Sequence, residues 1–318
     1  MKELVTDIKK LQDETINNLK NSKSRNTVRA YKSDFEDFGL FCIKNGFKSM
    51  PTDPKVVSLY LTYLSSKDVK ISTIKRRLVS IGVLHKMKGH YLDTKHPVII
   101  ENFMGIKRLK GVSQKGKKPL LINDLKHIID EINKQDEPEI KKLRNKALLL
   151  LGFAGGFRRR ELISLDLEDL EFVFEGVKIN IKRSKTDQFG EGFTKGIPHF
   201  ENYLYCPVKN LKNWINISKI KKGPVFVRFS KGSKLTGLRL TDQSVALIIK
   251  DCIKKTGINS NNYSGHSLRS GFATSAAEAG AEERSIMAMT GHKSTEMVRR
   301  YIKEANLFKN NALSKIKI

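Results

Sequence analysis

Apolar side chains recur at helical spacing through roughly the first hundred residues of the chain. Residues 24–45 carry the first such stripe, two more follow it, and another helix is expected from Pro97 towards Arg108. The pattern predicts a helical first domain whose core is built from these stripes. The three stripes are Val28, Tyr31, Phe35, Phe38 and Phe41; Val56, Leu59, Tyr60, Tyr63 and Leu64; and Ile71, Ile74, Leu78, Ile81 and Leu84.

The rest of the chain combines helices with short alternating runs typical of strands. A helix is expected around residues 121–133, and a second over residues 143–153 is almost wholly apolar and therefore buried on most sides. Glu175 and Gly176 separate two alternating runs, which indicates a β-hairpin, and a third strand is expected near residues 193–199. The pattern predicts a mainly helical α+β chain with a small antiparallel sheet in its second domain.

Between Lys107 and Pro119 the apolar periodicity stops, and basic residues gather without an acidic residue among them. This run predicts an exposed basic linker, residues 111–119, between domains of residues 1–110 and 120–318. A merely solvated or nuclear-import-like run is the alternative, but a position between two globular halves favours a hinge lying along DNA backbone. The candidate DNA contacts in the linker are Lys115, Lys117 and Lys118.

The charge balance indicates a polyanionic partner. The 318 residues include 60 lysines and arginines against 33 aspartates and glutamates, which gives a net charge of +27. Self-repulsion on this scale opposes a compact state, and the basic residues run through every predicted helix, which favours a DNA-wrapping body. Charge alone does not separate DNA from RNA or from an acidic membrane.

Cysteine usage and the terminal sequence narrow the class of protein. Cys42, Cys206 and Cys252 lie far apart without C-x-x-C spacing, which argues against a disulfide framework and a zinc site. The N-terminus lacks the apolar core of a signal peptide, and no apolar run approaches the roughly 20 residues of a membrane span. A cytoplasmic, nucleoid-associated protein is expected.

Candidate chemistry lies in a set of short motifs that occur in a fixed order. Cutting a phosphodiester without metal or water requires an in-line nucleophile, cations for the phosphoryl oxygens and an acid for the leaving oxygen. The set supplies a candidate for each role. It comprises Arg158 in GFRRREL, Lys185 in SKTD, His266 and Arg269 in HSLR, and His292 in a Gly-His pair nine residues before Tyr301.

Gly155 and Gly156 break the buried helix, so Arg158 is expected at the start of the next one, where a helix N-terminus favours an anion. Glu161 lies three residues on and could orient Arg158 or the neighbouring histidine. Arg159 and Arg160 compete for the phosphate role, and a surface arginine cluster is the plain alternative. In the same way Lys182 is the main rival of Lys185.

The C-terminal motifs have a predicted geometry. His266 and Arg269 are three residues apart and should share one helix face, with Ser264 as the cap before them. Nine residues place His292 and Tyr301 on opposite sides of a continuous helix, so a new helix is expected to begin between them, capped by Ser294 or Thr295. A solvated His-x-x-Arg pair and a core tyrosine are the ordinary alternatives for these residues.

With these motifs the chain resembles the tyrosine recombinase (phage integrase) family. The first half matches more loosely, through residues 24–31 with Asp34 and through residues 73–78, so Lys75, Arg76 and Arg77 become DNA-binding candidates. The resemblance implies an all-α, SAM-like core-binding domain followed by a mixed α/β catalytic domain. It assigns Arg158 and Arg269 to the phosphate, Lys185 to the leaving oxygen and Tyr301 to attack, with His266 and His292 completing the catalytic set. No further DNA-binding domain is expected before Ser24.

The function that this resemblance implies is site-specific DNA recombination through a 3′-phosphotyrosyl intermediate. It requires no cofactor, neither ATP nor a metal, and it uses four protomers on two double-stranded DNA sites, with accessory DNA-bending proteins as compatible partners. The tail after Tyr301 would dock on a neighbouring protomer, with Phe308 and Leu313 as candidate contacts. A type IB topoisomerase-like enzyme and a catalytically silent DNA-binding protein are the alternatives.

Overall fold

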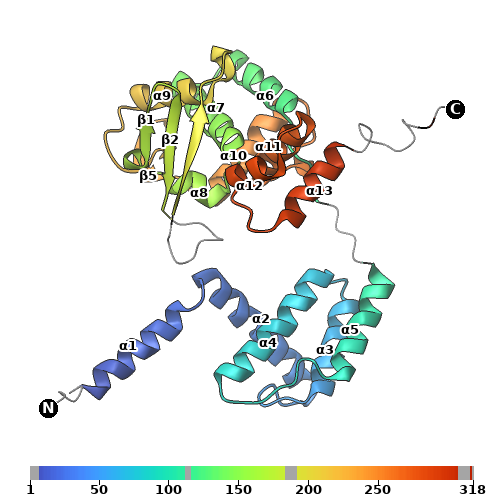
Figure 1. The fold of residues 1–318 in the computed structure, drawn as a ribbon. Coiled ribbons are helices and arrows are strands. Elements are labelled where there is room, and N and C mark those ends of the chain that lie inside the picture. The colour runs from blue at the N-terminus through green and yellow to red at the C-terminus, as the bar shows by residue number, and fades with distance from the viewer. Residues whose placement is uncertain (1–6, 112–115, 183–191, 307–315, 317–318) are drawn as a thin grey trace. The chain divides into compact units, whose positions relative to one another are not determined.

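The computed structural model describes residues 7–111, 116–182 and 192–306, together with Ile316 (Figure 1). The chain divides into two compact units, Met1–Lys115 and Gly116–Ile318. Helices dominate both units, and short antiparallel sheets occur in the second, which confirms the predicted mainly helical α+β class. The predicted domain boundaries at residues 110 and 120, and the linker over residues 111–119 between them, stay predictions.

The first unit consists of helices whose starts are encoded locally. Its helices are α1 (Ile8–Asn21), α2 (Arg25–Lys44), α3 (Pro54–Ser66), α4 (Ile71–Met87) and α5 (Pro97–Lys110). The Ser24 side chain accepts a hydrogen bond from the N–H of Thr27 and caps α2, and Asp53 caps α3 through the N–H of Lys55. Helix α1 was not predicted, because polar side chains fill most of its length.

The core of the first unit lies between α2, α3, α4 and α5. Its fully buried side chains are Phe38, Cys42, Val57, Tyr60, Leu61, Ile74, Ile81 and Ile99. The prediction is wrong for Val28, Leu59 and Tyr63, whose side chains are 49%, 52% and 41% exposed. On α3 the inward face follows positions 57, 60, 61 and 64, because the helix packs against both α4 and α5.

A buried polar network joins α2 to α4. Asp34, almost fully buried, accepts a hydrogen bond of 2.5 Å from Arg76, and Asp37 pairs with Arg77. Arg77 is only 19% exposed and therefore faces α2, unlike a residue on the solvent side of α4. Lys75 is exposed. A DNA contact by any of the three stays a prediction.

Helix α5 extends further than its apolar pattern indicates. Lys107, Arg108 and Lys110 lie in its last turn, not in an irregular linker, and Gly111 ends it with a φ of +69°. Cations at this end of a helix interact favourably with the helix dipole, so a basic run without apolar periodicity can still be helical.

The second unit surrounds α7, whose apolar residues are buried as predicted. Figure 1 shows the three-stranded sheet on one side of this unit and α11 to α13 on the other. The helices are α6 (Ile122–Lys134), α7 (Glu139–Ala154), α8 (Arg159–Ser164), α9 (Pro207–Ser218), α10 (Asp242–Lys254), α11 (Ser267–Glu278), α12 (Glu283–Thr290) and α13 (Thr295–Ala305). Trp214 of α9 is a core residue: it is fully buried and donates from Nε1 to the carbonyl oxygen of Val225.

The sheets combine a predicted hairpin with an unpredicted one. Strands β1 (Leu170–Phe172), β2 (Gly176–Ile181) and β3 (Phe193–Pro198) form an antiparallel sheet in that order, with Ile181 opposite Phe193. Strands β4 (Val227–Phe229) and β5 (Leu235–Arg239) form a separate pair. This pair was not predicted, because β5 is short and has no buried side chain to produce an alternating pattern.

The segment that enters the second unit is fastened to α11. The N–H of Lys118 donates to the carbonyl oxygen of Asn262, and the N–H of Leu120 donates to that of Ser267, at 2.8 and 2.9 Å. A Cβ at Gly271 would lie 1.8 Å from the carbonyl oxygen of Leu120. Only a glycine in α11 therefore allows this backbone to lie so close.

Strand β3 turns a lysine into the protein interior. Lys195 occupies an inward position next to Ile197 and is 2% exposed. Its Nζ donates hydrogen bonds to the carbonyl oxygens of Gly155 and Met289, each at 2.5 Å. Burial lowers the pKa of Lys195 to about 7, because removing an ammonium from water disfavours its charged form, and Arg269 and Arg158 lower it further while Glu161 opposes them.

We predict that this lysine makes stability depend on pH. Between about pH 7 and the ordinary lysine pKa of 10.5, the unfolded chain binds a proton that the folded chain has released, so this group favours folding more strongly as pH rises. In Lys195→Met that contribution is gone. The stability of the variant relative to the native chain is therefore expected to fall as pH rises through this window, as measured by urea unfolding.

The exposed Lys178 on β2 provides the matched control, since Lys178→Met removes a lysine from solvent. Its stability difference from the native chain should change little over the same pH range. A Lys195→Met difference that is equally flat would show that Lys195 keeps its ordinary pKa in the folded protein.

Candidate active site

Five of the six predicted catalytic residues lie together in the second unit, and Lys185 falls outside the described residues. Arg158 precedes α8, His266 precedes α11, and Arg269 lies in the first turn of α11. His292 lies between α12 and α13, and Tyr301 lies on α13. Helices that are far apart in sequence thus converge at one place.

Arg158 is held by its own helix start and by the Gly-His segment. Glu161 accepts from the backbone N–H of Arg158 at 2.9 Å and from its Nη1 at 2.6 Å, so the predicted orienting role has a direct contact. Nη2 of Arg158 donates to the carbonyl oxygen of Gly291 at 3.2 Å. The guanidinium is therefore fixed in direction by a charge-assisted bond on one side and a backbone bond on the other.

Arg269 is buried with part of its hydrogen-bonding capacity unused. It is 1% exposed, and its Nη1 donates to the carbonyl oxygen of Gly156 at 2.9 Å. Its Nε and Nη2 are buried and have no hydrogen-bond partner among the residues that the structure describes. Burial lowers its pKa to about 10, and Arg158 adds to that effect. Such a guanidinium is poorly satisfied until an anion reaches it.

The nucleophile candidate lies beside a histidine. The Tyr301 hydroxyl oxygen is 3.5 Å from Nε2 of His266, at the limit of a hydrogen bond. Tyr301 is 7% exposed and packs with Val298, Ile286 and Ala273 in a small cluster of α11, α12 and α13. The ring is thus anchored by apolar contacts while its oxygen faces the polar site.

The predicted cap before His266 is incorrect. Helix α11 begins at Ser267, so His266 itself is the capping position, and the Ser264 hydroxyl accepts from the N–H of His266 outside the helix. The Ser264 hydroxyl thus bonds within the turn before the helix and not to the first helical N–H groups. The Ser264 N–H in turn donates to the Ser267 hydroxyl at 2.9 Å. His266 and Arg269 still lie at the same end of α11.

His292 follows a left-handed glycine. Gly291 ends α12 with a φ of +61°, a conformation that favours glycine, and it turns the chain so that His292 precedes α13. Ser294 caps α13 as predicted, accepting from the N–H of Glu296. The rings of His292 and Tyr301 lie 6.3 Å apart between centroids. The two rings therefore lie close together although His292 precedes α13 and Tyr301 lies within it.

In the absence of DNA, the surroundings favour the uncharged forms of His266, His292 and Tyr301. Burial lowers the pKa of His292 to about 4, and Arg269 and Arg158 contribute to the shift. Burial also lowers the pKa of His266, with Arg269, Arg158 and Arg159 acting in the same direction. Burial raises the pKa of Tyr301, although Arg269 opposes this change. At neutral pH the phenol is therefore protonated and both imidazoles are neutral.

The remaining predicted residues are Lys182, the candidate DNA contacts of the linker and the candidate docking residues of the tail. Lys182, the rival of Lys185, is 63% exposed and pairs with Asp169 at 2.6 Å. Lys117 donates to the carbonyl oxygen of Asn261, and Lys118 is exposed. Lys115 lies outside the described residues, as do Phe308 and Leu313. Their contacts with DNA or with a neighbouring protomer stay predictions.

Two residues of the site were not predicted. Lys195 contacts the backbone before Arg158 and the backbone before His292, and Thr290 lies 2.7 Å from Nδ1 of His292. The sequence does contain a signal for Lys195, because this lysine occupies an inward position of an alternating strand. Thr290 had no signal beyond its place directly before the Gly-His pair.

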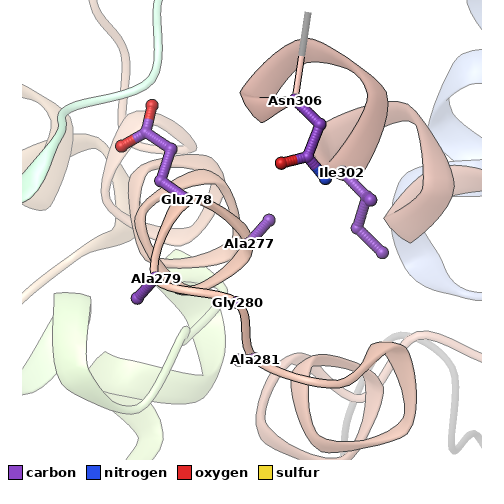
Figure 2. Close-up of a pocket in the computed structure, with 7 residues that line it drawn as sticks. All are labelled: Ala277, Glu278, Ala279, Gly280, Ala281, Ile302 and Asn306. Carbon is purple, nitrogen blue, oxygen red and sulfur yellow. The ribbon is translucent and has the colours of Figure 1, made fainter. Parts of the chain in front are cut away.

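A separate depression of about 400 Å³ lies between the ends of α11 and α13 (Figure 2). Ala277, Gly280 and Ile302 are among its lining residues, and none of the predicted catalytic residues lines it. Among the described residues, no group of three or more His, Cys, Asp or Glu is arranged to hold a metal ion. None of the helices in the described part of the chain is long and apolar enough to cross a membrane.

Comparison with known proteins places this arrangement in a family. Residues 120–307 match the phage integrase family, and residues 16–90 match the phage integrase N-terminal SAM-like domain. The chain is 38% identical over 301 residues to an integrase/recombinase xerD homolog from Selenomonas ruminantium, covering 94% of this chain and 87% of that protein. It is 24% identical over 289 residues to the tyrosine recombinase XerC of Staphylococcus haemolyticus, covering 89% and 88%.

Solved structures show the same fold at lower identity. The XerH site-specific recombinase bound to palindromic difH substrate has a TM-score of 0.60 at 19% identity, covering 82% of this chain and 73% of that one. A lambda integrase dimer bound to a core site has a TM-score of 0.59 at 16% identity, covering 96% and 79%. The sequence matches show that the chain belongs to the phage integrase family, the tyrosine recombinases.

Proposed function

We propose that the chain is a site-specific DNA recombinase in which Tyr301 attacks the scissile phosphate. The observation that carries this proposal is the buried Arg269 guanidinium, which lies beside Tyr301 and His266 with two nitrogens that have no partner among the described residues. A phosphoryl group would supply the missing acceptors, and a guanidinium suits two phosphoryl oxygens at once. The family match supports the same reaction.

Strand cleavage is a balanced transesterification. The Tyr301 oxygen forms a bond to phosphorus and gives its proton to Nε2 of His266, which is neutral and 3.5 Å away. The bond from phosphorus to the 5′ oxygen breaks, and that oxygen receives a proton from Lys185. The product is a 3′-phosphotyrosyl ester and a free 5′ hydroxyl. Rejoining reverses these steps on a new strand, so ATP and a metal are not needed.

The arginines offset the main energetic cost of attack. An ordinary tyrosine has a pKa near 10, so forming its phenolate at neutral pH costs about 4 kcal/mol, and burial of Tyr301 adds to that cost. Arg269 acts against it, and Arg158 stabilises the charge that develops on the phosphate. The two arginines therefore compensate the negative charge that forms during attack. Without DNA, Tyr301 stays protonated.

Double-stranded DNA is the partner that the net charge of +27 favours. The related XerH structure contains difH substrate and the lambda integrase structure a core site, and both support DNA as the partner here. A tetramer on two DNA sites, accessory DNA-bending proteins and a cytoplasmic, nucleoid-associated location belong to the same proposal. Lys75, Arg76, Arg77, Lys115, Lys117 and Lys118 remain its candidate DNA contacts.

The alternatives differ in what they do to a nicked suicide substrate, which traps a covalent intermediate. A recombinase should give covalent product at one sequence, whereas a type IB topoisomerase should relax DNA with little sequence preference. A catalytically silent DNA-binding protein should give neither product. The family match favours the first outcome.

We predict that Tyr301→Phe abolishes covalent attachment to DNA and leaves DNA affinity nearly unchanged. The substitution removes the nucleophilic oxygen, whereas affinity depends on many phosphate contacts. Adduct formation on the suicide substrate and affinity by electrophoretic shift measure the two effects. Tyr205→Phe is the control, because its hydroxyl bonds to Asp130 away from the site. Mass spectrometry that locates the trapped DNA on Tyr205 or Tyr263 would disprove the assignment.

We predict that Lys185→Ala is rescued by a substrate whose 5′ bridging oxygen is replaced by sulfur. Losing a general acid should slow cleavage of ordinary DNA roughly 10²- to 10⁴-fold, but a thiolate leaves with little need for a proton. Arg158→Ala and Arg269→Ala should gain no such rescue, because they act on non-bridging charge.

Lys182→Ala is the matched control for this experiment. Lys182 pairs with Asp169 in the free protein, so its loss should have a smaller effect on cleavage and show no rescue by sulfur. If sulfur rescues Lys182→Ala and leaves Lys185→Ala slow, Lys182 is the general acid.

A further inference from the structure

Thr290, at the end of α12, contacts the histidine of the Gly-His pair. Its side chain is fully buried, and its hydroxyl oxygen lies 2.7 Å from Nδ1 of His292. The same oxygen lies 2.6 Å from the carbonyl oxygen of Ile286, one helical turn earlier. Both distances are those of hydrogen bonds, so the Thr290 hydroxyl forms one hydrogen bond with His292 and another with Ile286.

The single hydroxyl hydrogen determines the direction of both bonds. A carbonyl oxygen can only accept, so the short contact between Thr290 and Ile286 requires the hydroxyl to donate to the carbonyl. If the hydrogen pointed to His292 instead, two oxygens would face each other at 2.6 Å with no hydrogen between them. The Thr290 oxygen must therefore accept from His292, and Nδ1 of that ring must carry a hydrogen.

We propose that Thr290 is a positioning residue that holds the ring proton of His292 on Nδ1 and leaves the lone pair of Nε2 for the reaction. The second part rests on the proposed function, and the first part stands on the hydrogen-bond geometry alone. In a neutral imidazole one nitrogen donates and the other accepts, and the partner of one nitrogen sets the role of the other.

The surroundings of His292 make this choice consequential. Burial, then Arg269, Arg158, His266 and Lys195, lower its pKa to about 4, so at neutral pH the ring carries one proton. Thr290 places that proton on the side away from Nε2. A second proton, drawn to His292 by the charge of a bound phosphate, can then enter only at Nε2. Thr290 thereby decides which edge of the ring exchanges protons.

The backbone around Thr290 is held by other contacts. Lys195 donates to the carbonyl oxygen of Met289, the preceding residue, and Arg158 donates to that of Gly291, the following one. The hydroxyl is therefore not needed to keep the segment in place. Thr290→Val keeps the branched shape of the side chain and removes only the hydroxyl, while Thr290→Ser keeps the hydroxyl and serves as the matched control.

The direct test is nitrogen NMR of the full-length protein labelled at its histidines, with His292→Gln used to assign the His292 signals. In the native chain and in Thr290→Ser, Nδ1 should carry the proton at neutral pH. In Thr290→Val the proton should move to Nε2 in a substantial fraction of molecules. A native ring protonated on Nε2, or a Thr290→Val ring unchanged from native, would overturn the proposal whatever the protein does to DNA.

The link to the reaction has a separate readout on the suicide substrate. Thr290→Val should slow adduct formation roughly 10- to 100-fold, the same range as the loss of a hydrogen-bond partner that orients a metal-binding histidine, with unchanged DNA affinity. Thr290→Ser should cleave at close to the native rate. A tautomer change with no change in rate would overturn the role of Nε2. Failure of the Tyr301→Phe test would instead reject the proposed function and leave the tautomer result standing.

Discussion

Buried positive charge without matching negative charge is the constraint on which this site depends. Arg158, Lys195 and Arg269 lie around the meeting point of α8, α11 and the Gly-His segment, and Glu161 is the carboxylate that faces them. Backbone carbonyl oxygens accept from each of these three basic side chains, of which Lys195 has its pKa lowered to about 7 by burial. The polypeptide thus solvates these charges with its own dipoles, and two nitrogens of Arg269 stay buried without a partner among the described residues.

The protonation states of the neighbouring groups follow from this constraint. Each added cation disfavours another positive charge, so His266 and His292 are neutral, and Lys195 itself has a pKa of about 7. A phosphate bound here would add negative charge beside these groups and make their protonation easier. Under the proposed function, DNA would therefore complete the electrostatics of the site as well as being its substrate.

Much of the fold could be predicted from local sequence, but the contacts inside the site could not. The cap at Ser294 and the buried run of α7 depend on neighbouring residues, and these predictions are confirmed. Lys195 finds its partners 40 and 94 residues away, which no periodicity can indicate. The exposure of Leu59 likewise depends on where α4 and α5 pack. Local pattern specifies elements, whereas tertiary packing specifies which side chains meet.

The fastening of residues 118–120 to α11 has a mechanical consequence. Two amide hydrogen bonds join this entry segment to Asn262 and Ser267, and Gly271 lets the backbones touch. Ser267 lies two residues before Arg269 in the same helix. Because Leu120 is itself buried in the hydrophobic core, tension applied to the chain just before the second unit is transmitted to the core and to the first turn of α11 together. Arg269, the proposed phosphate-binding residue, therefore lies two residues from the point at which that force enters α11.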